Sequence, residues 1–400
     1  MKNILGLKDL DLRDARVLMR VDFNVPLNDS GEITDDTRIE AALPSIQYIL
    51  DHKASLILMS HLGRPKGEFD PKYSLKPLAK ALSSRLGVDV KMASDCIGKE
   101  VEEMAHSLKP GDVLLLENLR FHEAEKKPEK DPEFAKKLAS LGTLYVNDAF
   151  GTSHRAHSSI VGVAECFPGK AAAGFLLKKE IEYLRDTLTK PKRPFCAIIG
   201  GAKISTKIDV IKALIEKVDA LLIGGGMAYT FLKAQGLSIG NSIFEEEYLD
   251  TANDILGRCI EKQVHFLLPH DLIVADAIRE DADILTVDAK EIPDGYEGVD
   301  IGPIAIEEFT EELQKAKTIF WNGPLGVYEV SLFSNGTKAI AEALADTSGI
   351  KIVGGGDSVS ALNAIGAAKK MTHVSTGGGA SLEFIEKGTL PGIEVLTLRT

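Results

Sequence analysis

The sequence has 400 residues, of which 44% are hydrophobic and 26% are charged, with 36 glycines and 16 prolines. This length exceeds that of a single small domain, and the composition is that of a globular protein rather than a disordered or fibrous chain. With 59 acidic and 47 basic side chains the formal net charge is -12, which argues against non-specific attraction to nucleic acids or anionic membranes.

Short aliphatic or β-branched runs alternate with longer amphipathic segments along the chain, which predicts β-α-β units and parallel sheets. In the first half, strands are expected at 16–23, 54–60, 112–118 and 143–150, with helices at 38–51, 75–86 and 132–141. In the second half, strands are expected at 194–201, 220–226, 264–271, 318–324, 351–357 and 373–379. No short-period repeat or low-complexity tract is present.

A segment with helical periodicity, residues 175–188, separates these halves and ends in the basic, proline-containing turn TKPKRP. We interpret it as a helix that joins two α/β domains. The alternative is one continuous domain with a surface helix. The predicted fold class is therefore α/β, with two Rossmann-like parallel-sheet domains joined by a hinge helix.

Polar and cationic residues follow every predicted strand of the first half, and Arg38 begins the first helix. In open α/β sheets, ligands bind beyond the carboxyl ends of the strands. The residues found there are Asp22, Asn24, His61, Arg64, Arg120, His154, Arg155 and His157. Because the planar guanidinium suits bidentate contact with phosphate or carboxylate, their convergence predicts a cationic pocket for a small, multiply anionic molecule.

Each of these residues also has a structural interpretation. A single arginine at such a position is more often solvated or half of an ion pair, but its recurrence at successive strand ends favours a shared site. The histidines are open to a ligand role or a structural role, and His157 is the less suited to a ligand. Asp22 is expected to cap a turn, or else to accept a hydrogen bond from a substrate hydroxyl or orient an arginine.

Glycines, instead of cations, follow the strands of the second half. The residues are Gly201 with Ala202, Lys203 and Lys207, then Gly224 to Gly226, Gly354 to Gly356 with Asp357 and Ser358, and Gly377 to Gly379. Glycine between a strand and a helix lets main-chain amides approach an anion, which the helix N-terminus also favours. One such triplet is explained by a tight turn, whereas four together predict a nucleotide with its phosphate chain.

Two common nucleotide motifs are absent, namely GxxxxGK[ST] and the dinucleotide fingerprint GxGxxG. Lys203 and Lys207, with Asp357 as a magnesium contact, remain as the groups that neutralise transferring phosphates. The alternative is that both lysines are solvated on a helix face and that Asp357 only caps the following helix.

The cysteines and the N-terminus bear on location. Cys96, Cys166, Cys196 and Cys259 lie far apart and form neither CxxC pairs nor a zinc pattern with the nine histidines. Charges interrupt the N-terminal segment too often for a secretory signal, and no stretch approaches the roughly 20 apolar residues of a membrane span. We therefore expect reduced thiols, a cytoplasmic location and no membrane partner.

A family resemblance follows from the motifs in their order. The chain contains, in this order, the motifs RVDFNVP, DDTRI, SHLGRP, ENLRFH, GTSHRAHSS, AAGFLLKKE, GGAKISTK, GGGMAYTFLK, WNGPLGVYE, VGGGDS and STGGGASLE. From about residue 20 to residue 386 they resemble the motifs of the phosphoglycerate kinase family. The resemblance implies reversible phosphoryl transfer between 1,3-bisphosphoglycerate and ADP, giving 3-phosphoglycerate and ATP, with Mg2+ and as a monomer.

The resemblance also implies that each domain binds a different substrate. An N-terminal domain, residues 1–174, would bind the phosphoglycerate, and a C-terminal domain, residues 190–386, the nucleotide. Residues 175–189 would form the helix between them, and the tail 387–400 would return to the first domain. Because the reactants then lie on different domains, we expect domain closure during the reaction.

Individual residues are assigned by the same motifs. The acid side comprises Asp22, Phe23, Asn24, Arg38, His61, Leu62, Gly63, Arg64, Arg120, His154 and Arg155. The nucleotide side comprises Gly201, Ala202, Lys203, Lys207, Gly225, Gly226, Asn322, Pro324, Val327, Glu329, Gly355, Gly356, Asp357 and Ser358, with Glu329 on the ribose and Asp357 on the metal. Arg38, Lys203 and the amides of Gly378 and Gly379 are expected to contact the transferring phosphoryl group.

The chemistry requires charge compensation rather than a base, because the carboxylate or phosphate nucleophile is already ionised at neutral pH. Two other classes of protein remain as alternatives. A nicotinamide-dependent oxidoreductase is disfavoured by the missing GxGxxG sequence. A non-catalytic protein that closes around an anionic metabolite would bind 3-phosphoglycerate without turnover.

Overall fold

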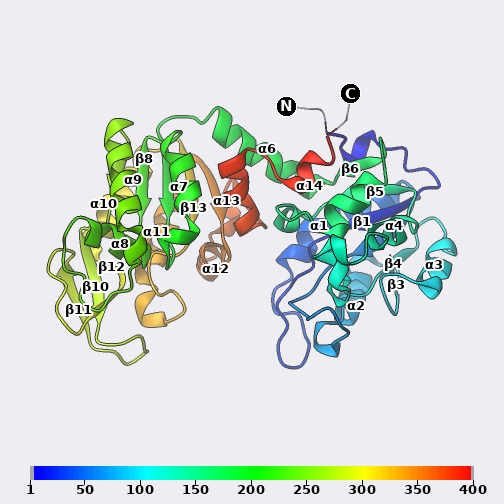
Figure 1. The fold of residues 1–400 in the computed structure, drawn as a ribbon, viewed down its shortest axis with the longest axis horizontal. Coiled ribbons are helices and arrows are strands. Elements are labelled where there is room, and N and C mark those ends of the chain that lie inside the picture. Colours follow the sequence, from blue (N-terminus) through cyan, green and yellow to red (C-terminus); the bar gives the residue numbers. More distant parts are fainter. Residues whose placement is uncertain (1–3, 398–400) are drawn as a thin grey trace. The chain divides into compact units, whose positions relative to one another are not determined.

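The computed structural model of the protein describes residues 4–397, which form two compact units (Figure 1). Unit 1 comprises residues 4–182 and 389–397, and unit 2 comprises residues 183–388. The first three and last three residues of the chain, which fall within the predicted first domain and tail, lie outside the described residues. Among the helices of residues 4–397, none combines the length and the apolar character that a bilayer span requires.

Unit 1 is built on a six-stranded parallel sheet with the order β3-β4-β2-β1-β5-β6. The strands are β1 (Arg16–Arg20), β2 (Ser55–Met59), β3 (Val90–Met92), β4 (Val113–Leu115), β5 (Leu144–Asn147) and β6 (Ala171–Ala173). In the middle of the sheet, Leu18 of β1 lies opposite Ile57 of β2 and Tyr145 of β5. The carboxyl ends of the strands therefore meet at one edge of the sheet, where the polar loops of the first half begin.

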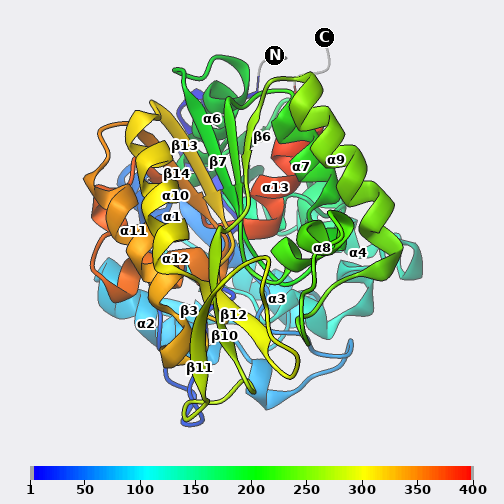
Figure 2. The same cartoon turned by 90° about the vertical axis from the view of Figure 1, so that its left-hand side faces the viewer.

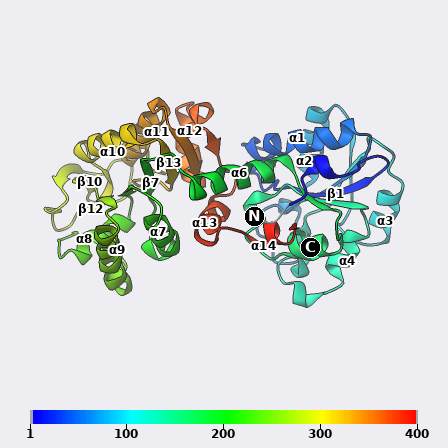
Figure 3. The same cartoon turned by 90° about the horizontal axis from the view of Figure 1, so that it is seen from above.

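Helices cover both faces of this sheet. They are α1 (Thr37–Asp51), α2 (Lys76–Leu86), α3 (Lys99–His106), α4 (Phe134–Ala139), α5 (Val163–Glu165) and α14 (Pro391–Glu394). Figure 3 shows α1 and α2 on one side of β1 and α4 on the other. Ile46 of α1 and Leu82 of α2 share one buried core with Met19 of β1 and Leu58 of β2. Burial on both faces explains why these strands are continuous aliphatic runs.

Helix α6 (Phe175–Thr189) leads the chain from unit 1 into unit 2, with the boundary between Glu182 and Tyr183. After unit 2, residues 389–397 belong again to unit 1. The Gly392 N–H there donates a 2.9 Å hydrogen bond to the carbonyl oxygen of Ser153. The loop that carries His154 and Arg155 is therefore held in part by the last described segment of the chain.

Unit 2 contains a second six-stranded parallel sheet, in the order β15-β14-β13-β7-β8-β9. The strands are β7 (Phe195–Ile199), β8 (Ala220–Ile223), β9 (His265–Leu267), β13 (Thr318–Asn322), β14 (Ile350–Gly354) and β15 (His373–Val374). The helices are α7 (Ile208–Ile215), α8 (Met227–Ala234), α9 (Leu249–Glu261), α10 (Pro303–Lys315), α11 (Asn335–Asp346), α12 (Gly356–Ala364) and α13 (Gly378–Lys387). Figure 2 shows α10 and α11 on one face and α7 and α9 on the other. The two parallel sheets confirm the predicted α/β class.

Unit 2 also has a three-stranded antiparallel sheet, β11-β10-β12, which the sequence patterns did not predict. Its strands are β10 (Asp271–Ala275), β11 (Ile284–Asp288) and β12 (Glu297–Ile301). The run 264–271, expected to be one strand, is divided between β9 and the first residue of β10, with Pro269 between them. Because β11 is mostly exposed, its residues lack the continuous apolar character that identified the other strands.

The remaining differences concern short elements. Strands β3 and β6 and helix α3 were not predicted, because three-residue strands such as VKM and AAA and an eight-residue helix carry too little periodicity. Most predicted strands extend beyond the observed ones into the following loops. Strand β1, for example, ends at Arg20, so Asp22 and Phe23 lie in the loop.

Candidate active site

In unit 1, the loops after β1, β2 and β4 and the first turn of α1 bring together four polar residues, which we call the acid cluster: Asp22, Arg38, His61 and Arg120. Arg38 Nη1 donates a 2.8 Å hydrogen bond to Asp22 Oδ2. Asp22 Oδ1 lies 3.8 Å from His61 Nδ1. Asp22 therefore orients an arginine, one of the three roles considered for it from the sequence.

The loop after β2 is tied on both sides at Gly63. Asn24 Oδ1 accepts a 2.7 Å hydrogen bond from the Gly63 N–H, and Arg120 Nη1 donates a 2.7 Å bond to the Gly63 carbonyl oxygen. Gly63 has φ +61, and a Cβ there would lie 2.4 Å from the Tyr73 ring. Only glycine suits this position, and the contacts fix the loop between His61 and Arg64.

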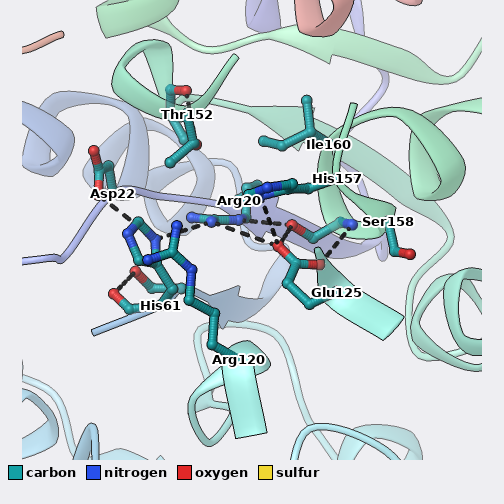
Figure 4. A network of polar contacts seen from close by, with 12 residues as sticks. Arg20, Asp22, His61, Arg120, Glu125, Thr152, His157, Ser158 and Ile160 are labelled. Atoms are coloured by element: carbon teal, nitrogen blue, oxygen red, sulfur yellow. Dashed lines mark hydrogen bonds and ion pairs between the residues drawn. The ribbon is translucent and has the colours of Figure 1, made fainter. Parts of the chain in front are cut away.

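Beneath the acid cluster lies a buried charged network that the motifs did not reveal (Figure 4). Arg20 and Glu125, both fully buried, approach to 3.9 Å between Nη2 and Oε1. Arg20 Nη2 also lies 3.2 Å from His61 Nδ1. Arg20 begins the motif RVDFNVP at the end of a buried strand, whereas Glu125 lies in the run EAEKKPEK, whose composition is typical of a solvated surface.

Burial and nearby positive charge keep the two histidines of this region neutral. Burial lowers the pKa of His61 well below its ordinary value, and the charges of Arg20, Arg120 and Arg38 lower it further. Burial, with Arg20, Arg120 and Arg155, lowers the pKa of His157 to about 3. The positive charge of the site is therefore supplied by guanidinium groups, which remain protonated in proteins.

Other predicted acid-side residues lie in different surroundings. Arg64 and Arg155 are exposed, and their side chains form no hydrogen bond or ion pair with the described residues. Their charges act on Arg120 and His157, so both lie near the cluster. His154 is partly buried. The side chains of Phe23 and Leu62 belong to the apolar core, so only their main chains can face a ligand.

In unit 2, the loops after β7, β8 and β13 pack against one another through glycine. The Gly201 N–H donates to the Pro324 carbonyl oxygen and the Gly225 N–H to that of Leu325, each over 3.0 Å. A Cβ at Gly225 would lie 2.8 Å from Gly201 N, and one at Gly226 would lie 2.8 Å from the Ala202 carbonyl oxygen. The N–H groups of Gly201 and Gly225 are therefore hydrogen-bonded to main-chain carbonyl oxygens. They are not the free anion donors that the glycine pattern predicted.

Lys207 and Asn322 meet at the centre of these loops. Lys207 Nζ donates a hydrogen bond to Asn322 Oδ1, and burial lowers the pKa of Lys207 to about 8, an effect that the charge of Asp357 opposes. Asn322 Nδ2 is enclosed and has no hydrogen-bond partner among residues 4–397. An ammonium group and an unused amide donor therefore lie together, as an anion site requires.

The loops after β14 and β15 end in helices whose first amides have no intrahelical acceptor. Gly355, with φ +98, leads into α12, and a Cβ at Gly378, the first residue of α13, would lie 2.9 Å from Gly355 Cα. Ser358 Oγ accepts a 2.8 Å hydrogen bond from the Gly323 N–H. The two helix N-termini are therefore close together and joined to the loop after β13.

Asp357 and Lys203 are exposed at these loops, and neither side chain forms a hydrogen bond or ion pair with the described residues. A single free carboxylate suits Mg2+, which usually takes one or two carboxylates and completes its shell with substrate phosphates and water. Glu329 is likewise exposed without such a partner, while the Val327 N–H is engaged by the Val299 carbonyl oxygen at 2.8 Å.

Unit 1 holds one more group of metal-ligand side chains. The ligand atoms of Asp95, Cys96 and His122 lie within 4.8 Å of one another. His122 Nε2, however, is bonded to Asp95 Oδ1 at 2.7 Å, and burial raises the pKa of the Cys96 thiol well above its usual range. A mixed sulfur, nitrogen and oxygen set is also unsuited to magnesium, so this group does not serve as the predicted metal site.

Comparisons with known proteins identify the family of this chain. The family model described as phosphoglycerate kinase matches residues 7–388. A cytosolic phosphoglycerate kinase of Nicotiana tabacum is 54% identical over 398 residues, covering 99% of this chain and 98% of the relative. The phosphoglycerate kinase of Dictyoglomus turgidum is 56% identical over 396 residues, covering 99% and 98%.

Solved structures give the same result. The structure of phosphoglycerate kinase from Coxiella burnetii is similar with a TM-score of 0.87 and 42% identity, covering 99% of both chains. That of the enzyme from Pyrococcus horikoshii has a TM-score of 0.86 and 32% identity, also covering 99% of both chains. The likeness thus extends over both units and both parallel sheets. The chain belongs to the phosphoglycerate kinase family.

Proposed function

We propose that this chain, a phosphotransferase with a carboxyl group as acceptor, holds the phosphoglycerate on unit 1 and the nucleotide on unit 2. The reaction is the reversible transfer of a phosphoryl group between 1,3-bisphosphoglycerate and ADP, giving 3-phosphoglycerate and ATP. The observation that carries the allocation is the contrast between the two sites. Guanidinium groups gather at the strand ends of unit 1, whereas unit 2 offers helix N-termini and the Lys207–Asn322 pair.

Asp22, Asn24, Arg38, His61 and Arg120 then contact or orient the acid, and exposed Arg64 and Arg155 add positive charge. On unit 2, Lys207 and Asn322 contact the phosphate chain, and Glu329 binds the ribose. Mg2+ on Asp357 offsets the negative charge of the phosphates when it is bound. The exposed, unpartnered state of Asp357 supports this last assignment.

Arg38 and Lys203, with the amides of Gly378 and Gly379, contact the transferring phosphoryl group in this proposal. The carboxylate and phosphate nucleophiles are already ionised, so the side chains align the reactants and compensate charge rather than remove a proton. The lowered pKa values of His61 and His157 make both rings weak bases, which agrees with a reaction that has no histidine base. We further propose that the enzyme acts as a cytoplasmic monomer, and that transfer requires the units to bring the reacting atoms to roughly 3 Å.

The test is turnover of the full chain with 3-phosphoglycerate and Mg-ATP, the acyl phosphate being consumed by an NADH-linked reaction. Arg38→Ala and Lys203→Ala should each lower kcat by about 10²- to 10³-fold, the loss expected for a preorganised donor. Arg13→Ala and Lys290→Ala, which remove exposed charges from units 1 and 2, should leave kcat unchanged. Near wild-type turnover in both site variants would refute the assignment.

The allocation of ligands is tested separately by hydrogen exchange. 3-Phosphoglycerate alone should protect the loops of unit 1 that contain residues 22–24 and 61–64, and ADP alone should protect the loops of unit 2 around residues 203 and 357. Protection of one unit by both ligands would contradict the allocation. Small-angle scattering with both ligands bound should show compaction relative to the free protein, and no change would contradict the requirement for approach.

A further inference from the structure

The buried network of unit 1 connects a carboxylate that cannot touch the substrate to a histidine of the acid cluster. Arg20 Nε donates a 2.9 Å hydrogen bond to Ser159 Oγ, which in turn donates to Glu125 Oε1 over 2.7 Å. The Ser159 N–H donates to Glu125 Oε2 at 3.0 Å. Ser159 is therefore both acceptor and donor, and Glu125 has both of its oxygens engaged beneath the guanidinium (Figure 4).

The other side of the guanidinium faces His61. Arg20 Nη1 donates to the Val21 carbonyl oxygen, and Nη2 lies 3.2 Å from His61 Nδ1. A guanidinium has donors and no acceptor, so His61 Nδ1 must be the bare nitrogen that accepts this bond. The single proton of the neutral ring is then on Nε2, since a proton on Nδ1 would place two donors against each other.

His61 Nε2 is the atom through which this arrangement reaches a ligand. It makes no hydrogen bond with residues 4–397, and unlike His157 Nδ1 it is not fully enclosed. A donor with solvent access and no internal partner, next to Arg38 and Arg120, suits an anionic or hydroxyl oxygen of a bound acid.

The surrounding charges all bear on this ring. The groups that face it are Arg20 from β1, Asp22 from the following loop, Arg38 from α1, Arg120 from the turn after β4, and His157 before the turn Ser158–Gly162. The three arginines and His157 disfavour a second proton on the His61 ring, whereas the Asp22 carboxylate favours a second proton. Glu125, behind Arg20, balances the buried guanidinium without contacting the ring.

We propose that Glu125 is a positioning residue that, through Ser159 and Arg20, holds His61 as a neutral ring whose Nε2–H donates to the bound phosphoglycerate. This inference rests on the proposed function for the identity of the ligand. Without the Glu125 charge, Arg20 would be a buried cation with no counter-charge, and it would no longer be held against His61.

The first measurement is the state of the ring in the ligand-free full chain with 15N-labelled histidine, His61 being assigned with the His61→Gln variant. Nδ1 should give the chemical shift of a bare ring nitrogen and Nε2 that of a protonated one, unchanged between about pH 5 and pH 8. A proton on Nδ1, or a titration of His61 in that range, would overturn the proposal. Nitrogen shifts are preferable to a rate profile, because a phosphate monoester itself titrates near pH 6.

The second measurement uses Glu125→Gln, which keeps the size and one acceptor oxygen but removes the charge. KM for 3-phosphoglycerate should rise about ten-fold with KM for Mg-ATP unchanged, the loss of roughly one held hydrogen bond. Glu125→Asp retains the charge and should recover most of this loss. Glu123→Gln is the matched control. The Glu123 side chain is half-exposed and hydrogen-bonded to Lys127, so this change should alter neither constant.

The positioning role of Glu125 and the proposed function would be contradicted by different results. An unchanged KM for 3-phosphoglycerate and an unchanged His61 spectrum in Glu125→Gln would overturn the positioning role. If Glu125→Gln is poorly folded, the wild-type spectrum and Glu125→Asp still decide the proposal. The proposed function would fail in a different way, because 3-phosphoglycerate would then shift no histidine signal of unit 1 in the wild-type protein.

Discussion

Arg38, in the first turn of α1, donates a 2.8 Å hydrogen bond through Nη1 to Oδ2 of Asp22, in the loop after β1. The Asp22 side chain is 9% exposed and that of Arg38 is 35% exposed, so the carboxylate is fixed and the guanidinium reaches solvent. The pair therefore presents a pre-oriented cation at the edge of the unit 1 sheet. The acid cluster owes its geometry to this anion as well as to its cations.

The role of this pair is tested with Asp22→Asn. Arg38 should lose its charged partner and its fixed orientation, and kcat should fall by about ten-fold, because misplacing a group that meets the transferring phosphoryl raises the barrier. Added to Arg38→Ala, the Asp22→Asn change should lower kcat little further, because the two residues act together. Fully additive losses in the double variant would show that Asp22 acts independently of Arg38.

The lowered pKa of Lys207 predicts that nucleotide binding depends on pH. Its folded-state pKa is lowered to about 8 by burial, so the ammonium is lost as the pH rises through about 8. ADP affinity, measured by calorimetry with Mg2+, should fall above that pH, since an anion binds the charged form more strongly. Lys207→Arg stays charged and should show a smaller fall, and identical pH profiles for the two proteins would exclude Lys207 as the titrating group.

The same group has the opposite effect on the stability of the ligand-free protein. The unfolded chain keeps the ordinary lysine pKa of 10.5, above the folded value of about 8. Between these two values the unfolded state binds more protons, so the contribution of Lys207 to the free energy of unfolding rises with pH. The free energies of unfolding of the wild-type protein and of Lys207→Met, measured by equilibrium denaturation, should differ less at pH 10 than at pH 7.

Gly225 is predicted to be required for packing. It has φ +69, and a Cβ would lie 2.8 Å from both N and O of Gly201. Gly225→Ala should destabilise unit 2 by at least about 1–2 kcal/mol from the left-handed backbone alone. Gly356→Ala is the matched change, since nothing lies within 4 Å of its Cβ position. Thermal unfolding should show a lower transition temperature for Gly225→Ala only. Equal transition temperatures for the two variants would mean that the loops adapt to the added Cβ.

Asp357 predicts the metal dependence. Asp357→Asn keeps the size but removes the charge that suits Mg2+, so the magnesium concentration for half-maximal activity should rise. The KM for 3-phosphoglycerate should not change, because unit 1 is untouched. Asp209→Asn, an exposed carboxylate in the first turn of α7, serves as the control. An unchanged magnesium requirement in Asp357→Asn would remove this residue from the metal site.

The fold class and the residue types at each sheet edge could be predicted from the amino-acid sequence alone. The helix expected at 38–51 is α1 (Thr37–Asp51), and the segment at 175–188 lies within α6 (Phe175–Thr189). These features depend on local periodicity, because a helix or a buried strand repeats its apolar side chains over neighbouring residues. The order of strands and polar loops then predicts which residue types gather at the carboxyl ends.

Which of those residues are partners, and which are buried, is known only from the three-dimensional structure. Arg20 and Ser159 are 139 positions apart and Lys207 and Asn322 are 115 apart, so no local pattern could pair them. Packing likewise engages the amides of Gly201 and Gly225 with the loop after β13 and encloses Glu125 despite its charged neighbours in the sequence. Burial and hydrogen-bond partners depend on which distant segments meet, whereas composition and periodicity record only what each segment can contribute.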